Sequence, residues 1–300
     1  MHVAEYAEMC LFLTELVFPT ETTPGSINVT FRPPDSEQEK RLEVALEPDV
    51  SDLELVDVNM HASRCQGYDM GTQYNSWFSD CFGFPVKFLY LGGNLRSVRG
   101  NVSPTYIPND AGWMSSIKSN ISYYTKSTAV DKGIGFADCA PLLITTLKSL
   151  ESVNTEANFP PNDQMIMEKF RPNIVLAGAE EPWEEDFWAE LTLYPYEDPD
   201  RKLGIKLTAN CARCTSLNVD FKTGKPGKTE SGTVLKKLSK YRRVDKGSPY
   251  SPIFGRYGFM MQLHEDAKLS KGDEVLVAAR NTQRTKWCKY YSLVDVLILL

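Results

Sequence analysis

The sequence predicts an α+β protein in which most strands are antiparallel. Short apolar runs alternate with clusters of Pro, Gly, Asp and Thr over much of the chain, which is typical of β-strands joined by turns. Few segments show the apolar spacing of an amphipathic helix. The chain has 300 residues, of which 42% are hydrophobic and 24% are charged. That length is enough for one large domain or for two of ordinary size.

The first 94 residues are predicted to form a β-rich unit. Turn-forming residues separate five short apolar runs, at 9–17, 27–31, 42–46, 53–58 and 86–91. The segment 65–71 contains two glycines and an aspartate and predicts a turn. This turn leads into an amphipathic helix around residues 74–81, with Trp77 and Phe78 on its inward face.

Residues 95–135 are the predicted connection between two domains, because they are rich in Ser, Asn, Tyr and Gly and show little periodicity. An apolar run at 138–144 then predicts a strand. Thr145 or Thr146 is placed to cap a following helix. The apolar face of that helix would carry Leu147, Leu150 and Val153.

The rest of the chain is predicted to combine strands with short helices. A strand is expected at 171–176, followed by a short helix at 182–191. The first turn of that helix holds Glu184, Glu185 and Asp186. Acidic side chains favour the positive end of a helix dipole, so the run is interpreted as a solvated helix start. Further strands are predicted at 203–208, 214–219, 258–263 and 274–278, and a further helix at 233–241.

Charge and cysteine content argue against several classes of protein. The net charge of -6 is unlike that of a general nucleic-acid binder, which needs clustered Lys and Arg. Seven scattered cysteines favour a reducing, intracellular compartment over a disulfide-rich secreted scaffold. We find no signal-peptide pattern and no run approaching the roughly 20 apolar residues of a transmembrane segment. Residues 281–300 are predicted to be an irregular tail, whose apolar end at 292–300 is interpreted as a strand or a docking tail.

A Cys-x-x-Cys pair, Cys211 and Cys214, allows four interpretations. Structural zinc requires a second ligand pair at short spacing, which the chain does not supply. A thioredoxin-like dithiol is expected to open a helix after a strand, whereas this pair leads into a β-branched run and a turn. The cysteines can also be two buried hydrophobic residues, or one can be a thiolate ligand of a soft metal. Arg213 favours the last interpretation, because a guanidinium favours thiolate over thiol and can hold a phosphate.

A second segment offers groups that suit an anionic ligand. Arg171 precedes Pro172, which fixes φ and removes an amide donor, so Arg171 is expected at a strand start with restricted geometry. Asn173 offers donors and acceptors to the edge of a heterocycle. Asp138 can accept from ring N–H groups, although an aspartate at such a position is commonly a local cap. With the cysteine pair, these side chains are expected to converge on one anionic, metal-bearing ligand.

These residues resemble the MOSC family, the molybdenum-cofactor sulfurase C-terminal-like domains, and within it the proteins that have a β-barrel domain before the MOSC domain. The matching motifs are Gly67-x-Asp69-x-Gly71, the run from Asp138 to Ile144, Arg171-Pro172-Asn173-Ile174-Val175, Cys211-Ala212-Arg213-Cys214, Thr223-Gly224, Tyr241-Arg242, Pro252-Ile253-Phe254-Gly255 and Gly272-Asp273-Glu274-Val275. The resemblance implies a partial N-terminal MOSC-type β-barrel domain at 1–94 and a connection at 95–135. A MOSC β-barrel domain with short helices would follow at 136–280, before the tail at 281–300.

The resemblance also implies a molybdenum–molybdopterin cofactor. In the family, the thiol that matches Cys214 is the protein ligand of molybdenum, and the pterin dithiolene otherwise holds the metal. The positions expected to line the pterin and phosphate pocket match Asp138, Cys139, Ala140, Arg171, Asn173, Ala212, Arg213 and Tyr257. The implied reaction is the two-electron reduction of N-hydroxylated compounds, with Cys214 as the catalytic residue. Electrons would come from a haem or flavin partner, typically a cytochrome b5 and its reductase.

The chain departs from the family pattern at two places. It begins after the strands that normally start the N-terminal barrel and carry a Lys-Ser type cofactor contact and a further Arg, so part of the phosphate site is expected to be missing. Cys139 and Ala140 stand where the family has small hydroxylated residues, which removes two hydroxyl donors. The family implies a mitochondrial outer-membrane location for a full-length form, and a cytoplasmic location otherwise.

Two other functions stay open. The chain would be a sulfur carrier or a cofactor-handling module if Cys214 or Cys211 bears a persulfide and no reduction is catalysed. It would be a degenerate, non-catalytic β-rich binding protein if it folds and melts without any cofactor.

Overall fold

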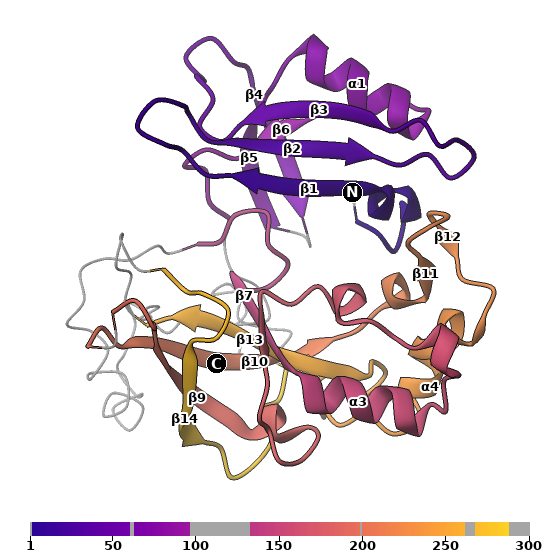
Figure 1. The fold of residues 1–300 in the computed structure, drawn as a ribbon, viewed down its shortest axis with the longest axis vertical. Coiled ribbons are helices and arrows are strands. Elements are labelled where there is room, and N and C mark those ends of the chain that lie inside the picture. The colour runs from indigo at the N-terminus through magenta and orange to yellow at the C-terminus, as the bar shows by residue number, and fades with distance from the viewer. Residues whose placement is uncertain (1, 61–62, 97–132, 199, 262–267, 288–300) are drawn as a thin grey trace, which may run out of the picture. The chain divides into compact units, whose positions relative to one another are not determined.

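The computed structural model describes residues 2–60, 63–96, 133–198, 200–261 and 268–287 (Figure 1). The chain divides into two compact units. The first comprises Met1–Asn59, Arg64–Asn94 and Cys214–Leu235, and the second comprises Met60–Ser63, Leu95–Arg213 and Lys236–Leu300. Most strand pairs are antiparallel and the helices are few and short, which confirms the predicted α+β class. The predicted domain boundaries stay predictions.

The first unit contains two small antiparallel sheets. Three strands form each sheet, in the orders β1-β2-β3 and β4-β5-β6. Their bounds are Phe12–Val17 (β1), Ser26–Phe31 (β2), Lys40–Ala45 (β3), Leu55–Met60 (β4), Ser63–Asp69 (β5) and Leu89–Tyr90 (β6). The five predicted strands of this part are all present, but the turn predicted at 65–71 is wrong, because most of it belongs to β5. Small residues such as Ser63 and Gly67 occupy the buried face of β5. The sequence of this strand therefore does not show the alternation of apolar and polar residues that predicts a strand.

The predicted amphipathic helix is confirmed as α1, Thr72–Phe82. Trp77 and Phe78 lie against Phe12 of β1, with ring centroids 6.1 and 5.6 Å from that of Phe12. The helix ends at Gly83, whose φ of 77° places it in the left-handed region that favours glycine. An aromatic face and a glycine C-cap therefore define this helix, and both are visible in the sequence.

Short elements complete the first unit. They are the 3₁₀-helices η1 (Ala7–Leu11), η5 (Thr215–Asn218) and η6 (Glu230–Thr233) and the paired strands β11 (Val219–Asp220) and β12 (Lys225–Pro226). The strand predicted at 214–219 is wrong, because η5 occupies most of it. The helix predicted at 233–241 is shorter than expected, since α4 spans Val234–Leu238.

A six-stranded sheet forms the second unit and curls into a half-barrel (Figure 1). The strand order is β14-β9-β10-β13-β7-β8, and all neighbours are antiparallel except β7 and β8. The bounds are Leu142–Thr146 (β7), Ile174–Leu176 (β8), Trp188–Tyr194 (β9), Leu203–Ala212 (β10), Ile253–Met260 (β13) and Glu274–Arg280 (β14). Alternate residues of the central strands, including Leu191, Leu203 and Ile205, build a buried apolar core.

Helix α3, Leu147–Glu156, follows β7 and begins as the sequence predicts. The Thr146 hydroxyl accepts a hydrogen bond from the backbone N–H of Ser149, which is an N-cap contact. The predicted apolar face is only partly correct, since Val153 is fully buried but Leu147 is 50% exposed. Further short 3₁₀-helices of this unit are η2 (Pro161–Asp163), η3 (Met167–Phe170) and η4 (Glu184–Phe187).

The helix predicted at 182–191 is wrong. Only η4 is helical, and β9 starts directly after it. The acidic run is not solvated throughout either, since Glu185 and Asp186 are completely buried. Asp186 pairs with Arg242, 56 residues further along the chain, so its carboxylate is held by a long-range partner and not by solvent. Local charge patterns do not reveal such a partner.

The strand predicted at 171–176 is also shorter than expected, since β8 starts at Ile174. Arg171 caps the end of η3 with φ 54° and ψ 44°, in the left-handed region, so it does not lie at a strand start.

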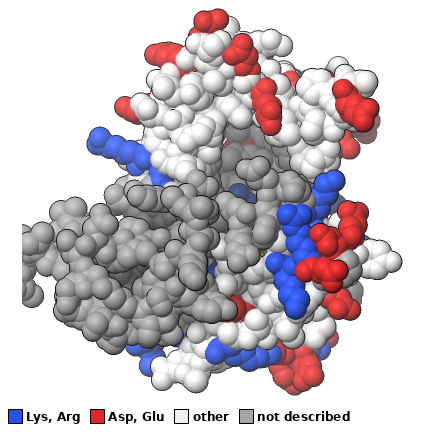
Figure 2. Space-filling view, turned by 90° about the vertical axis from the view of Figure 1, so that its left-hand side faces the viewer, with Lys and Arg blue, Asp and Glu red and all other residues white. Residues whose placement is uncertain are grey.

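Most of the predicted connection (97–132) and of the C-terminal tail (288–300) lies outside the described residues. No helix in the described part of the chain has the length and apolar composition needed to cross a bilayer. On the face shown in Figure 2, several basic side chains lie beside acidic ones.

Candidate functional site

The end of strand β10 is buried on both faces. Cys211 is 2% exposed and belongs to an apolar cluster with Tyr257 of β13. Its neighbour Asn210 is 1% exposed and pairs across the strands with Arg256. Shifts in the β10–β13 register occur between Leu207 and Ala209 and again between Asn210 and Ala212. Such irregularities re-aim side chains near a strand end, and here they precede the motif residues.

Arg213, the residue after β10, is held by three contacts within the second unit. Its backbone N–H donates to the Pro252 carbonyl at 2.9 Å. Its guanidinium donates from Nη1 to the Cys211 Sγ at 2.8 Å and from Nη2 to the Phe170 carbonyl at 2.7 Å. The guanidinium also lies over the Phe170 ring, 5.4 Å from its centroid. These contacts fix the arginine and leave its other N–H donors for a ligand.

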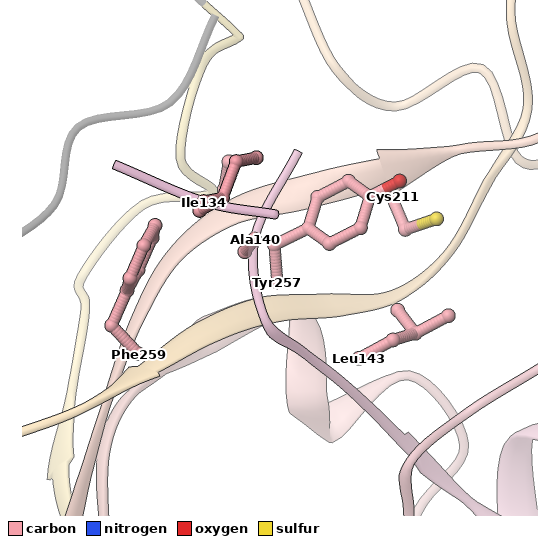
Figure 3. Close-up of a cluster of buried hydrophobic side chains, with 7 residues drawn as sticks. Ile134, Ala140, Leu143, Cys211, Tyr257 and Phe259 are labelled. Atoms are coloured by element: carbon pink, nitrogen blue, oxygen red, sulfur yellow. The ribbon is translucent and has the colours of Figure 1, made fainter. Parts of the chain in front are cut away.

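Two thiols lie beside one phenol. Figure 3 shows the Tyr257 ring between Ala140 and Cys211. Burial raises the pKa of the Tyr257 phenol far above its usual value, and the neighbouring Cys211 and Cys139 thiols add to the shift. Burial also raises the pKa of Cys139 to about 12, although a hydrogen bond from Tyr257 acts in the opposite direction. At neutral pH, Tyr257 and Cys139 are therefore both protonated.

The structure adds a residue that the sequence did not reveal, Arg96. It is 2% exposed and donates to the carbonyls of Gly135 (3.0 Å), Ala137 and Asp138 (2.7 Å). The backbone of Arg96 also pairs with that of Ile134 in an isolated antiparallel bridge. Arg96 thus fixes the segment that leads into Cys139 and Ala140. Arg96 is a single arginine before a region of little periodicity, so the sequence did not indicate that it holds this segment.

Arg171 and Asn173 follow Phe170, whose carbonyl accepts from Arg213, in the sequence. Asn173 exchanges two hydrogen bonds with Leu143 of β7: its Oδ1 accepts from the Leu143 N–H at 2.8 Å, and its backbone N–H donates to the Leu143 carbonyl at 2.9 Å. Neither of these two hydrogen bonds uses the side-chain NH₂ group of Asn173. Arg171 is exposed, and within the described part of the chain its guanidinium forms no ion pair.

Cys214, the predicted molybdenum ligand, belongs to the first unit and starts η5 as its N-cap. The residue is exposed, and its Sγ lies 3.2 Å from the Ser216 Oγ. It forms no disulfide with any described cysteine. Cys211 and Cys214 thus connect a strand to a short 3₁₀-helix. The expectation that the pair leads into a β-branched run and a turn, which argued against a thioredoxin-like dithiol, is therefore wrong. Burial of Cys211 and exposure of Cys214 give the two thiols different environments.

A buried ionic network lies behind the end of β10 in the second unit. The Arg242 Nη2 donates to both carboxylate oxygens of Asp186, at 2.8 and 3.0 Å. The Arg284 Nε donates to the same carboxylate at 2.8 Å. Asn210 connects two more charged residues, because its Nδ2 donates to Asp245 at 2.8 Å while its Oδ1 accepts from Arg256 at 2.5 Å. The sequence showed Tyr241-Arg242 only as a motif and gave no sign of this network.

Burial shifts the pKa of two residues in this region. Burial lowers the pKa of Arg256 to about 10, and nearby carboxylates counteract the shift. Burial raises the pKa of Glu185, whose Oε1 has no hydrogen-bond partner among the described residues. Its Oε2 accepts from the Thr146 hydroxyl at 3.3 Å. A buried carboxyl with a raised pKa favours its neutral form, which reduces the cost of burying a charge.

The structure brings most of the predicted pocket residues of the second unit to one end of the sheet. Cys139, Ala140 and Tyr257 share a cluster with Cys211. Arg213 joins that cluster to Phe170, and Ala212 pairs with Ile253 of β13. Asp138 takes part through its backbone carbonyl, and its side chain is exposed. Cys214 lies in the other unit, so its role beside these residues stays a prediction.

These donors suit a soft metal held by a thiol and an anion held by guanidinium groups. Cys214 offers an exposed thiol, the ligand type that soft transition metals prefer. Arg171 is exposed and Arg213 is anchored with donors to spare, so both can hold a phosphate. No group of three or more His, Cys, Asp or Glu residues that could hold a metal occurs among the described residues.

The class of the C-terminal part follows from a comparison with protein-family models. Residues 131–276 match the family model described as MOSC domain. The chain therefore has a MOSC domain in its C-terminal part.

Parts of the chain are similar to curated proteins. The chain is 37% identical over 128 residues to mitochondrial amidoxime reducing component 2 of Macaca fascicularis, which covers 41% of this chain and 34% of the relative. It is 26% identical over 235 residues to the protein of that name from Bos taurus, covering 75% of this chain and 57% of the relative. It is 24% identical over 214 residues to molybdenum cofactor sulfurase of Arabidopsis thaliana, covering 69% of this chain and 22% of the relative. The chain thus spans about a third to three fifths of the amidoxime reducing components it matches.

Proposed function

We propose that this protein is a molybdenum-cofactor-binding oxidoreductase that reduces N-hydroxylated compounds. The exposed thiol of Cys214 is the observation that carries the proposal, because it lies inside the MOSC match and forms no disulfide with a described cysteine. The names of the amidoxime reducing components support the reaction type. In the reaction, the N–O bond breaks, and two electrons and two protons yield the reduced nitrogen compound and water.

The roles of the residues follow from their chemistry. Cys214 is the metal ligand and catalytic residue, while Arg171, Asn173 and Arg213 hold the anionic and heterocyclic parts of the cofactor. Asp138, Cys139, Ala140, Ala212 and Tyr257 complete the pocket. Bound molybdenum cofactor supplies two-electron redox chemistry that side chains alone do not provide. Because Tyr257 and Cys139 stay protonated at neutral pH, they act as neutral hydrogen-bonding groups rather than as bases.

The electron donor and the location are also part of the proposal. A haem or flavin protein of the cytochrome b5 and reductase type would deliver the two electrons. The names of the relatives suggest a mitochondrial location. The family resemblance implies the electron donor, and the names of the relatives support the location.

Metal content tests the cofactor assignment. The purified full chain is analysed for molybdenum and for the fluorescence of the oxidised pterin, as wild type and as Cys214→Ala. Near-stoichiometric metal in the wild type and at least a tenfold loss in Cys214→Ala are expected. Cys81→Ala is the matched control, because Cys81 lies half-buried on α1 and should keep the metal content unchanged. Normal molybdenum in Cys214→Ala would refute the ligand assignment.

A sulfur-carrier function is the second candidate, favoured by the relatives named molybdenum cofactor sulfurase and by the same exposed thiol. In that case Cys214 bears a persulfide, and no N-hydroxylated compound is reduced. Intact-protein mass spectrometry of wild type and Cys214→Ala separates the two functions. One added sulfur that depends on Cys214, without molybdenum, would favour the sulfur carrier over the reductase.

A further inference from the structure

The chain from the second half of α4 to residue 246 is strongly basic (Figure 1). Of the eleven residues at 236–246, six are Lys or Arg and one is acidic. The chain as a whole has a net charge of -6, so this segment has the opposite sign to the rest of the chain. The whole segment belongs to the second unit. Such a local charge asymmetry is typical of a surface that meets an anionic partner.

The fold leaves only basic charges of this segment on the surface. Its one acid, Asp245, is 1% exposed, and its Oδ1 accepts from the backbone N–H of Trp287 at 2.9 Å. Arg242 is 2% exposed, and the half-buried Lys237 donates from Nζ to the Ala157 carbonyl at 2.8 Å. The basic residues of the segment that stay exposed are Lys236, Lys240, Arg243 and Lys246.

The exposed lysines lie on one side of a continuous turn. Leu238 is completely buried, Arg242 is nearly so, and the Arg242 N–H donates to the Leu238 carbonyl at 2.8 Å. With 3.6 residues per turn, Lys236 and Lys240 lie on the face opposite these two buried residues. Among the described residues, none of the four exposed basic side chains forms an ion pair. Their charges therefore remain for a partner.

One acidic residue outside the segment acts on the same surface. Burial, and after it the Glu156 carboxylate, raise the pKa of Tyr241 to about 12. Glu156 is the exposed last residue of α3, so it lies close to the basic segment. One carboxylate offsets one of four basic charges and leaves the surface positive. Acidic residues further than about 10 Å away act weakly, because salt at about 0.1 M screens them.

The kinds of side chain indicate the kind of partner. Three of the four exposed basic residues are lysines, and lysine is depleted in protein–protein interfaces. A lysine is a flexible, strongly hydrated charge, and clusters of lysines are attracted to anionic lipid headgroups. Tyr250 follows Lys246 by four residues and is 85% exposed. A tyrosine has an apolar ring and a polar tip, which suit the boundary between headgroups and acyl chains.

We propose that Lys236, Lys240, Arg243 and Lys246 form a surface that binds the headgroups of an anionic lipid bilayer. None of these residues is a predicted cofactor residue. The surface is therefore separate from the proposed molybdenum site, and the proposal does not depend on the proposed function.

Vesicle sedimentation with the purified full chain tests the proposal. One set of vesicles contains phosphatidylserine and phosphatidylcholine in equal parts, and the other contains phosphatidylcholine alone. We expect the chain to sediment with the anionic vesicles and not with the neutral ones, and added salt should release it. An absence of sedimentation with the anionic vesicles, or equal sedimentation with both sets, would overturn the proposal. This comparison uses the unmodified chain, so it decides without any variant.

Two double variants test the location of the surface. Lys236→Gln with Lys240→Gln should bind the anionic vesicles roughly 25-fold more weakly, at about fivefold for each lysine. Lys268→Gln with Lys271→Gln is the matched control, because it changes the net charge equally at exposed positions of the second unit and should bind like wild type. Equal losses in the two double variants would contradict the assigned surface.

Poly-glutamate distinguishes a lipid surface from an acidic protein. It presents carboxylates on a polypeptide, and it is added as a competitor at the same charge concentration as the anionic vesicles. We expect the chain to stay on the vesicles, because poly-glutamate offers no interface for Tyr250. Release of the chain by poly-glutamate would overturn the lipid assignment in favour of an acidic protein partner.

Discussion

Replacing Arg242 with Met should destabilise the second unit strongly. Arg242 is 2% exposed, and its Nη2 donates to both oxygens of the completely buried Asp186 carboxylate. Removing one partner of a buried ion pair leaves an uncompensated charge and costs about 3–5 kcal/mol. Arg284 also donates to Asp186, so part of the compensation remains. We therefore expect a loss near the lower end, about 3 kcal/mol in the free energy of unfolding.

The same substitution should act on the proposed cofactor site. The Arg242 Nε donates to the Ile253 carbonyl at 3.0 Å, and the Arg242 carbonyl accepts from the Ile253 N–H at 2.9 Å. The residue before Ile253 is Pro252, whose carbonyl accepts the Arg213 N–H. Arg242 thus secures the segment that positions Arg213. A lower molybdenum content of Arg242→Met is expected as a second readout.

Urea unfolding, followed by tryptophan fluorescence, measures the change in stability. Arg243→Met is the matched control: its side chain is exposed and adjacent in sequence, so it should stay within about 0.5 kcal/mol of wild type. The double variant Asp186→Asn with Arg242→Met removes both opposite charges and should recover part of the loss. Equal stabilities of Arg242→Met and Arg243→Met would refute the reasoning. Simple additivity in the double variant would show that the two side chains are not energetically coupled.

Two further substitutions test backbone conformation and pH dependence. Gly255 has φ 84°, and a Cβ there would lie 2.8 Å from the Ile144 carbonyl oxygen. Gly255→Ala should therefore lose more than about 1 kcal/mol relative to Gly178→Ala, which has φ 86° but an open surrounding, in thermal melts of both variants. Lys87, 2.8 Å from Asp69, and then hydrogen bonds from the Gly71 N–H and the Asn75 side chain lower the pKa of that carboxyl from 3.8 to about 2. Because the folded state binds the proton less well, this stabilisation is complete above about pH 4 and is lost as the pH falls towards 2; melts from pH 2 to 6 should show a weaker pH dependence for Asp69→Asn.

Elements with a local cause were predictable from the sequence. The Thr146 cap acts within a few residues, so the start of α3 agrees with the prediction, and α1 covers the helix predicted around 74–81. The segment from Ser63 to Asp69 was not predictable as a strand, because small and polar residues form its buried face. The run from Pro182 was misinterpreted for the opposite reason, since its acids satisfy a helix-start pattern while Asp186 is bound by Arg242 far along the chain.

The candidate site divides in the same way. Arg213 and Cys211 are two residues apart, so their contact at 2.8 Å follows from a motif that the sequence displays. The contact of Cys139 with Tyr257 joins positions more than a hundred residues apart and needs the pairing of β13 with β7 to form. Arg96 donates to backbone carbonyls of the loop before Cys139, and carbonyls carry no sequence signal.

The end of β10 shows how the thiol cluster and the ionic network affect each other. Asn210 and Arg256 face each other across β10 and β13 and connect to the charges behind the sheet. The next residues on these strands, Cys211 and Tyr257, belong to the apolar cluster instead. Successive side chains of a strand point to opposite faces, so each strand carries one network on either side. The ionic network therefore lies on the same two strands that position Cys211, whose sulfur accepts from the Arg213 guanidinium.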